Sequence, residues 1–119
     1  WLCAEDMARF GLLYLHNGVW DDQQVVPSEW VKQSTVRHSE GSPSWGGGEY
    51  GYQWWIAKLM IGLEPVECFY GLGFGGQFLY VVPEFNLVVA ATSQNVQNPF
   101  AIRTYMENYI LKPLVENKN

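Results

Sequence analysis

Residues 66–92 read VECFYGLGFGGQFLYVVPEFNLVVAAT, and this stretch decides the fold. Two β-rich runs, 77–82 and 87–92, stand on either side of the tight turn Pro83-Glu84-Phe85-Asn86, which predicts an antiparallel hairpin. A third run, 66–70, precedes four glycines within six residues. Glycines so placed indicate either a sharp turn or bulge where a strand begins, or a backbone that a ligand approaches closely.

The flanking segments predict helices around this sheet. Residues 52–59 supply another strand run, so the sheet has about four strands. Upstream, apolar residues recur at helical spacing until Gly18, and a small hairpin and a short helix capped by Ser28 follow. Downstream, Asn98 and Pro99 begin a helix that Pro113 should end or kink. The order predicts an α+β fold: an antiparallel sheet flanked by helices.

Composition narrows the function classes. A length of 119 residues suits one domain, and 48% hydrophobic residues favour a packed core. Six Trp, seven Tyr and six Phe indicate an aromatic core or an apolar face that meets another surface. A net charge of −5 without a basic stripe argues against a nucleic-acid partner. Cys3 and Cys68 are expected to be buried thiols, and no cofactor or metal site is predicted.

Several local motifs favour no particular chemistry. Residues 71–76 satisfy G-x-G-x-x-G, but a strand follows them where a dinucleotide site needs a helix. Residues 41–45 fall one glycine short of a nucleophile elbow. His16 and His38 lack metal-ligand spacing, and Glu67 is expected to face solvent from its strand.

Longer stretches resemble a known family. The segments 6–15, 18–20 and 25–31 resemble the late helical region of hydrolases related to class C β-lactamases and penicillin-binding proteins. Residues 50–55 resemble the strand that follows there. The segment 70–77, continued by Val81-Val82-Pro83-Glu84, looks like the family's third-motif strand, in the G-x-G-G-Q form of esterases and 6-aminohexanoate-oligomer hydrolases.

The resemblance implies a partial β-lactamase/transpeptidase-like fold, with residues 1–119 as the C-terminal part of a serine hydrolase domain. It implies acyl transfer on a small ester or amide substrate. The backbone N–H of Phe74 would serve the oxyanion hole. The residues expected to contact substrate are Gly71, Gly73, Gly75, Gly76 and Gln77. The partner would be the rest of the parent domain, and an exposed sheet could also self-associate.

Departures from the family pattern leave alternatives open. The sequence contains no Ser-x-x-Lys and no Tyr-x-Asn, so no nucleophile is assigned and the chain alone is expected to be inactive. At the third motif, Gly71 replaces the usual Lys or His, with Cys68 as the ungapped alternative. This favours an esterase or amidase parent. It is also compatible with a non-catalytic binding member of the superfamily, and a free-standing structural domain is a third possibility. The cellular compartment stays open.

Overall fold

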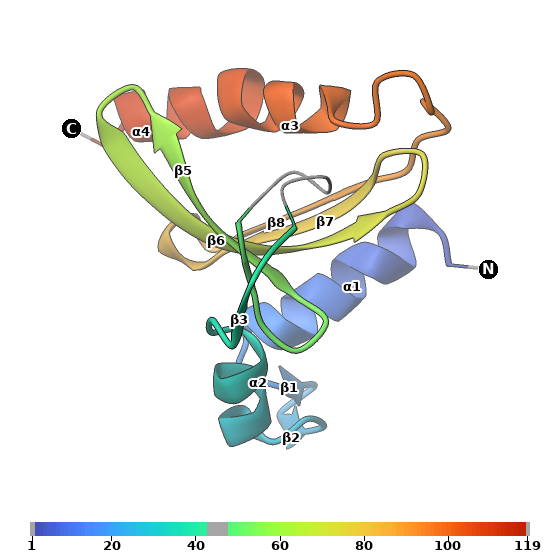
Figure 1. Cartoon of the computed structure of the whole chain (residues 1–119). Helices are drawn as coiled ribbons and strands as arrows, with labels where there is room; N and C mark the ends of the chain where they lie inside the picture. Colours follow the sequence, from blue (N-terminus) through green and yellow to red (C-terminus); the bar gives the residue numbers. More distant parts are fainter. Residues whose placement is uncertain (1, 43–47, 119) are drawn as a thin grey trace.

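A computed structural model describes residues 2–42 and 48–118 as three layers, with helices on both faces of a central sheet (Figure 1). Helix α1 (Ala4–Leu15) covers one face, and the C-terminal helical run covers the other. The main sheet is antiparallel, with the order β3-β4-β5-β6-β7-β8, so every strand pairs with its neighbour in sequence. The predicted α+β class with an antiparallel sheet is confirmed.

The four predicted strand runs form the four longer strands. They are β5 (Trp55–Ile61), β6 (Glu64–Gly73), β7 (Gln77–Val82) and β8 (Leu87–Ala91). The short 3-10 turn η2 (Pro83–Phe85) joins β7 to β8, and Asn86 follows it in a left-handed conformation (φ 50°). Val82 pairs with Leu87, as expected for a hairpin closed by this turn.

Side chains alternate across the sheet and build two separate cores. From β7, Phe78, Tyr80 and Val82 pack toward the C-terminal helices, together with Met106 and Leu111. Leu79 and Val81 point to the opposite face and pack with Tyr14 of α1, Trp54 and Phe69. Because all five of these β7 side chains are buried, β7 is the strand that both helical layers share.

Helix α1 approaches the sheet closely because Gly11 lies at the contact. A Cβ built at Gly11 would stand 2.6 Å from Val88 Cγ1 and 3.0 Å from Leu79 Cδ1. The N-terminus of α1 is held by two hydrogen bonds to Asp6 Oδ2, which the Cys3 N–H and the Cys3 Sγ donate at 3.3 and 3.1 Å. These hydrogen bonds, with Arg9 nearby, lower the pKa of Asp6.

The C-terminal helical run differs from the expectation that Pro113 ends or kinks it. The run comprises α3 (Ala101–Tyr105), the π-helical segment η3 (Met106–Leu111) and α4 (Lys112–Glu116). Pro113 occupies the first turn of α4, where its missing N–H costs no hydrogen bond of that helix. The helix also starts at Ala101, later than Asn98 and Pro99 suggested.

The region before β5 contains more structure than the sequence indicated. The small hairpin exists, but β1 (Val19–Trp20) pairs with β2 (Gln23–Gln24), because Asp21 and Asp22 take positive φ in a two-residue turn. Helix α2 (Ser28–Ser34) begins at Ser28, so Pro27 is the cap residue. Short strands β3 (Ser39–Glu40) and β4 (Glu49–Tyr50) extend the main sheet beyond β5.

The buried hydroxyl of Tyr80 gives a test of the core. It has no hydrogen-bond partner among the described residues, although its ring stacks on Phe78 at 5.2 Å. An unsatisfied buried hydroxyl costs about 1–3 kcal/mol. Tyr80→Phe keeps the ring and removes that cost, so it should raise the free energy of unfolding measured by urea denaturation. Tyr70→Phe, at a neighbouring ring 5.2 Å away, is the control and should give no gain. A destabilised Tyr80→Phe variant would contradict this account of the core.

Candidate functional site

The glycine cluster forms the turn between β6 and β7. Gly73 pairs with Gln77, which leaves residues 74–76 as the loop. Gly75 and Gly76 have φ of 80° and 90°, a conformation that side-chain-bearing residues rarely adopt. A Cβ at Gly76 would also lie 2.7 Å from the Pro99 carbonyl oxygen. These two glycines are therefore required by the turn itself.

The other two glycines are not required in this way. Gly71 and Gly73 lie within β6 and have no positive φ. A Cβ at Gly71 would meet nothing nearer than Leu79 Cβ, at 3.9 Å, whereas one at Gly73 would lie 3.0 Å from Gln77 Cβ. Both line a groove on the α1 face of the sheet. Their lack of side chains leaves the β6 backbone open to a molecule in that groove.

Gln77 is bonded within the chain. Its side-chain Nε2 donates to the Ser93 carbonyl, and its Oε1 accepts from the Ser93 N–H at 3.3 Å. The Asn95 N–H donates to the Gly75 carbonyl at 3.0 Å. Together these bonds fasten the segment after β8 to the glycine turn. The substrate contact predicted for Gln77 stays a prediction, and the structure adds this positioning role to it.

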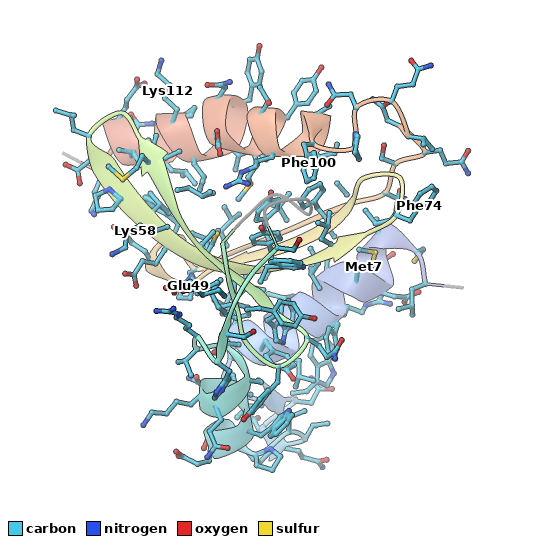
Figure 2. The ribbon with its side chains drawn as sticks, in the orientation of Figure 1. Met7, Glu49, Lys58, Phe74, Phe100 and Lys112 are labelled. Carbon is cyan, nitrogen blue, oxygen red and sulfur yellow. The ribbon has the colours of Figure 1, made fainter. Side chains whose placement is uncertain are left out.

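Phe74 occupies the tip of the turn, with its side chain 78% exposed. Figure 2 shows it at the same end of the sheet as Met7 of α1. No hydrogen bond joins the Phe74 N–H to another described residue. Phe74 and Gly73 also border a small cavity of about 150 Å³ that reaches Pro99 and Phe100. The donor predicted for the oxyanion hole is thus not engaged in the β6–β7 ladder.

The groove beside the turn has a volume of about 540 Å³. Gly71, Gly73, Gln77 and Leu79 form its floor. Its walls are mostly aromatic and come from α1, α2 and the segment before β5, and they include Phe10, Tyr14, Trp30, Tyr52 and Trp54. Phe10 stacks on Trp54 at 6.0 Å, and Trp30 stacks on Tyr52 at 5.5 Å. The abundance of aromatics indicated an apolar face, but the sequence did not place these residues at the site.

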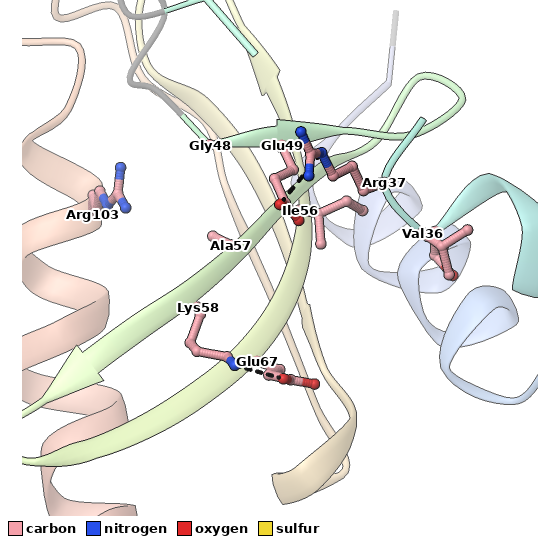
Figure 3. A pocket seen from close by; sticks show the side chains of 10 residues that line it. Val36, Arg37, Gly48, Glu49, Ile56, Ala57, Lys58, Glu67 and Arg103 are labelled. Carbon is pink, nitrogen blue, oxygen red and sulfur yellow. Dashed lines mark ion pairs between the residues drawn. The ribbon is translucent and has the colours of Figure 1, made fainter. Parts of the chain in front are cut away.

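A second, slightly larger hollow of about 620 Å³ lies at the edge of the sheet around β4 and β5 (Figure 3). Its polar side chains pair with each other: Arg37 with Glu49 at 3.5 Å, and Lys58 with Glu67 at 3.3 Å. Glu67 is 78% exposed, in agreement with the solvent-facing position expected for it. None of the residues that line this hollow belongs to the glycine cluster, so the groove is the better candidate site.

The other residues that the sequence analysis considered do not line the groove or are not described by the structure. His16 is exposed at the end of α1. His38 stacks on Tyr52 at 3.9 Å and bonds to the Gln33 carbonyl. Residues 43–47, which include part of the near-miss nucleophile elbow, are not described. In residues 2–42 and 48–118 no group of three or more potential metal ligands comes together, and no helix is long and apolar enough to cross a membrane.

The two candidate positions for the missing Lys or His fall on opposite faces of β6. Gly71 lines the groove, whereas Cys68 is buried in the core under the C-terminal helices. Burial raises the pKa of the Cys68 thiol to about 12, although Arg103 opposes the shift. Of these two residues, only Gly71 lies where a third-motif residue could meet a substrate.

Comparisons with known proteins agree with a hydrolase. No family model matches the chain. A protein of Alkalihalophilus pseudofirmus, described as uncharacterised, is 26% identical over 105 residues, or 83% of this chain and 31% of that protein. A solved structure described as "Putative 6-aminohexanoate-dimer hydrolase from Bacillus anthracis" is 28% identical over 96% of this chain, with a TM-score of 0.69. The chain spans 29% of that structure, and the likeness supports a hydrolase-related family.

The two cysteines provide a test of this geometry. Cys68 is buried as expected, but the expectation of a buried thiol is wrong for Cys3, which is exposed beside the first turn of α1, where its Sγ donates to Asp6. Because the thiolate is the reactive form, a buried thiol whose pKa is about 12 should not react at pH 8. Native protein should therefore titrate one fast thiol with Ellman's reagent, and urea-unfolded protein should titrate two. The fast thiol should disappear in Cys3→Ser and persist in Cys68→Ser. Two fast thiols in native protein would show that Cys68 is accessible.

The same thiol predicts a loss of stability at high pH. The folded state raises the pKa of Cys68 above its ordinary value of 9.0, which favours the neutral thiol. This contribution is fully present below pH 9 and is lost as the pH rises toward 12. The fall in the free energy of unfolding between these pH values should be smaller in Cys68→Ala than in the unmodified chain.

Proposed function

We propose that this chain is the C-terminal part of a serine hydrolase that cleaves an ester or amide through an acyl-enzyme. The nucleophilic serine and its base would come from a segment N-terminal to residue 1. The observation that carries the proposal is the likeness to the solved hydrolase over nearly the whole chain, combined with a backbone N–H at Phe74 that donates to no other described residue. The name of that neighbour makes an amide one candidate substrate class.

The reaction requires a donor where negative charge develops. When a serine oxygen attacks the carbonyl carbon, the serine proton passes to a base, and the carbonyl electron pair moves onto oxygen. The Phe74 N–H would donate to that oxyanion, beside the N–H of the serine itself. Collapse of the intermediate expels the alcohol or amine, which takes up the proton. Water then releases the acyl group by the same steps.

The turn supplies the rigidity that such a donor needs. Gly75 and Gly76 permit the positive φ of the loop. The two hydrogen bonds between Gln77 and Ser93, and the one from the Asn95 N–H to the Gly75 carbonyl, hold the loop against the next segment. A donor held in place before the reaction loses no energy to reorganisation when charge develops. Gly71 and Gly73 would let the substrate backbone or acyl group approach β6.

A non-catalytic binding member of the same superfamily is the second candidate. It is favoured by the uncharged residue Gly71 at the position where the family has Lys or His. The groove would then hold a ligand without turning it over. Detection of a covalent serine adduct with a fluorophosphonate probe on the full-length protein separates the two candidates, because only the hydrolase would be labelled.

The isolated chain should be inactive. Since it lacks a Ser-x-x-Lys motif, purified residues 1–119 should hydrolyse p-nitrophenyl esters and nitrocefin no faster than buffer. Absorbance assays with increasing protein concentration measure this. Turnover that survives purification and is abolished by substitution of a serine within the chain would contradict the proposal.

Phe74→Pro tests the oxyanion donor directly, because proline has no backbone N–H. Phe74 is exposed, does not have a positive φ, and makes no N–H bond to a described residue, so the change should leave the fold intact. In the full-length enzyme, kcat should fall on the order of 10²–10³-fold. Phe74→Ala keeps the N–H and should change kcat little. Equal activity of the two variants, with unchanged circular dichroism, would remove Phe74 from the oxyanion hole.

A further inference from the structure

The groove beside the glycine turn is lined by uncharged side chains. Among the described residues that line it, none carries a charge. Its polar side-chain groups are hydroxyls, amides and the indole N–H groups of two tryptophans, and the Gln77 amide already bonds to Ser93. The rest of the surface is aromatic or aliphatic. A ligand in contact with this wall therefore meets no cation that could pair with a carboxylate.

The charges of the adjoining helix are turned away from the groove. In α1 the charged residues are Glu5, Asp6 and Arg9, and none of them lines it. Arg9 pairs with Glu5 and, at 3.4 Å, with Asp6, so its charge is balanced within one exposed cluster. A carboxylate moved from water into this groove would lose hydration without gaining an ion pair.

The shape of the lining favours a flat group. Trp30 and Tyr52 stack with an interplanar angle of 16°, and both are nearly half exposed, at 45% and 44%. Phe10 stacks on Trp54 and is 48% exposed. An aromatic ligand gains by offset or edge contacts with such rings in addition to apolar burial. The glycine floor at Gly71 and Gly73 leaves room for it against β6.

We propose that the groove binds an uncharged aromatic group of the ligand. That this group belongs to a hydrolysed ester or amide rests on the proposed function, whereas its binding does not. The groove would hold the aryl part while the reacting carbonyl lies toward Phe74. The same lining disfavours substrates that place a carboxylate at this wall.

The test compares two probes of the same shape, 4-phenylbutyramide and 4-phenylbutyrate, on isolated residues 1–119. Backbone amide chemical shifts from ¹H–¹⁵N spectra locate the binding. The neutral amide should shift Gly71 and Gly73 saturably, and the carboxylate should bind about tenfold or more weakly because it must be desolvated without a partner. Equal affinities, or shifts confined to other residues, would overturn the proposal.

Two variants with a matched control sharpen the result. Trp30→Ala removes one wall and should weaken binding of the amide several-fold, whereas Trp20→Ala, at an exposed tryptophan outside the groove, should not. Phe10→Lys places a cation at the wall and should reverse the preference in favour of the carboxylate. Because this is a gain of binding, a misfolded variant cannot mimic it, and failure to reverse the preference would count against the assignment.

The outcome also separates this inference from the proposed function. Binding of the amide by the isolated chain, with no serine labelling of the full-length protein, would retain the aromatic site and reject the hydrolase. The opposite outcome is that the full-length protein hydrolyses esters without preferring aryl over small acyl groups, and that the isolated chain binds no probe. This outcome would retain the hydrolase and reject the aromatic site.

Discussion

The structure depends on the burial of β7 on both faces. Its side chains from Phe78 to Val82 are at most 6% exposed and belong alternately to the two cores. A strand in this position must carry an unbroken apolar run, and its neighbours must supply hydrogen bonds on both edges. β6 and β8 supply these hydrogen bonds. The two helical layers cover the β7 side chains that point to either face of the sheet. The glycine turn leads directly into this strand, which anchors one side of the turn in the best-packed part of the molecule.

Local signals in the sequence were sufficient to predict the strands and the hairpin after β7. Pro83 and Asn86 have backbone preferences that few other arrangements satisfy, so the turn could be placed to the residue. Pro113 was misleading because its effect depends on where the helix register lies. Its place in the first turn of α4 follows from the π-helical segment before it, which apolar periodicity does not reveal. β3 and β4 are only two residues each, too short for an alternation pattern.

The candidate site could be predicted only in part. The residues of its floor lie close together in the sequence, whereas the residues of its walls come from separate segments. The glycine cluster indicated either a sharp turn or a backbone that a ligand can approach. In the structure, each explanation applies to two of the four glycines. Gly75 and Gly76 shape the turn, whereas Gly71 and Gly73 face the groove. Phe10, Trp30 and Tyr52 come from three separate segments, and nothing in their local sequence distinguishes a groove wall from core. Their proximity arises from the way α1 and α2 pack, which is tertiary information.

The turn after β6 and the glycines within β6 contribute different properties to the candidate site. The glycines permit the turn, and the hydrogen bonds of Gln77 with Ser93 and of Asn95 with Gly75 restrain it, so a donor on the turn is held in direction by these contacts. The neighbouring strand β6, lacking side chains at Gly71 and Gly73, places no charged side chain in the groove. Specificity on this wall must then come from shape and from the exclusion of charged groups, since an unpaired charge is costly in an apolar groove. In the proposed site, the backbone would supply the fixed polar group, and the aromatic rings would decide which ligands can lie beside it.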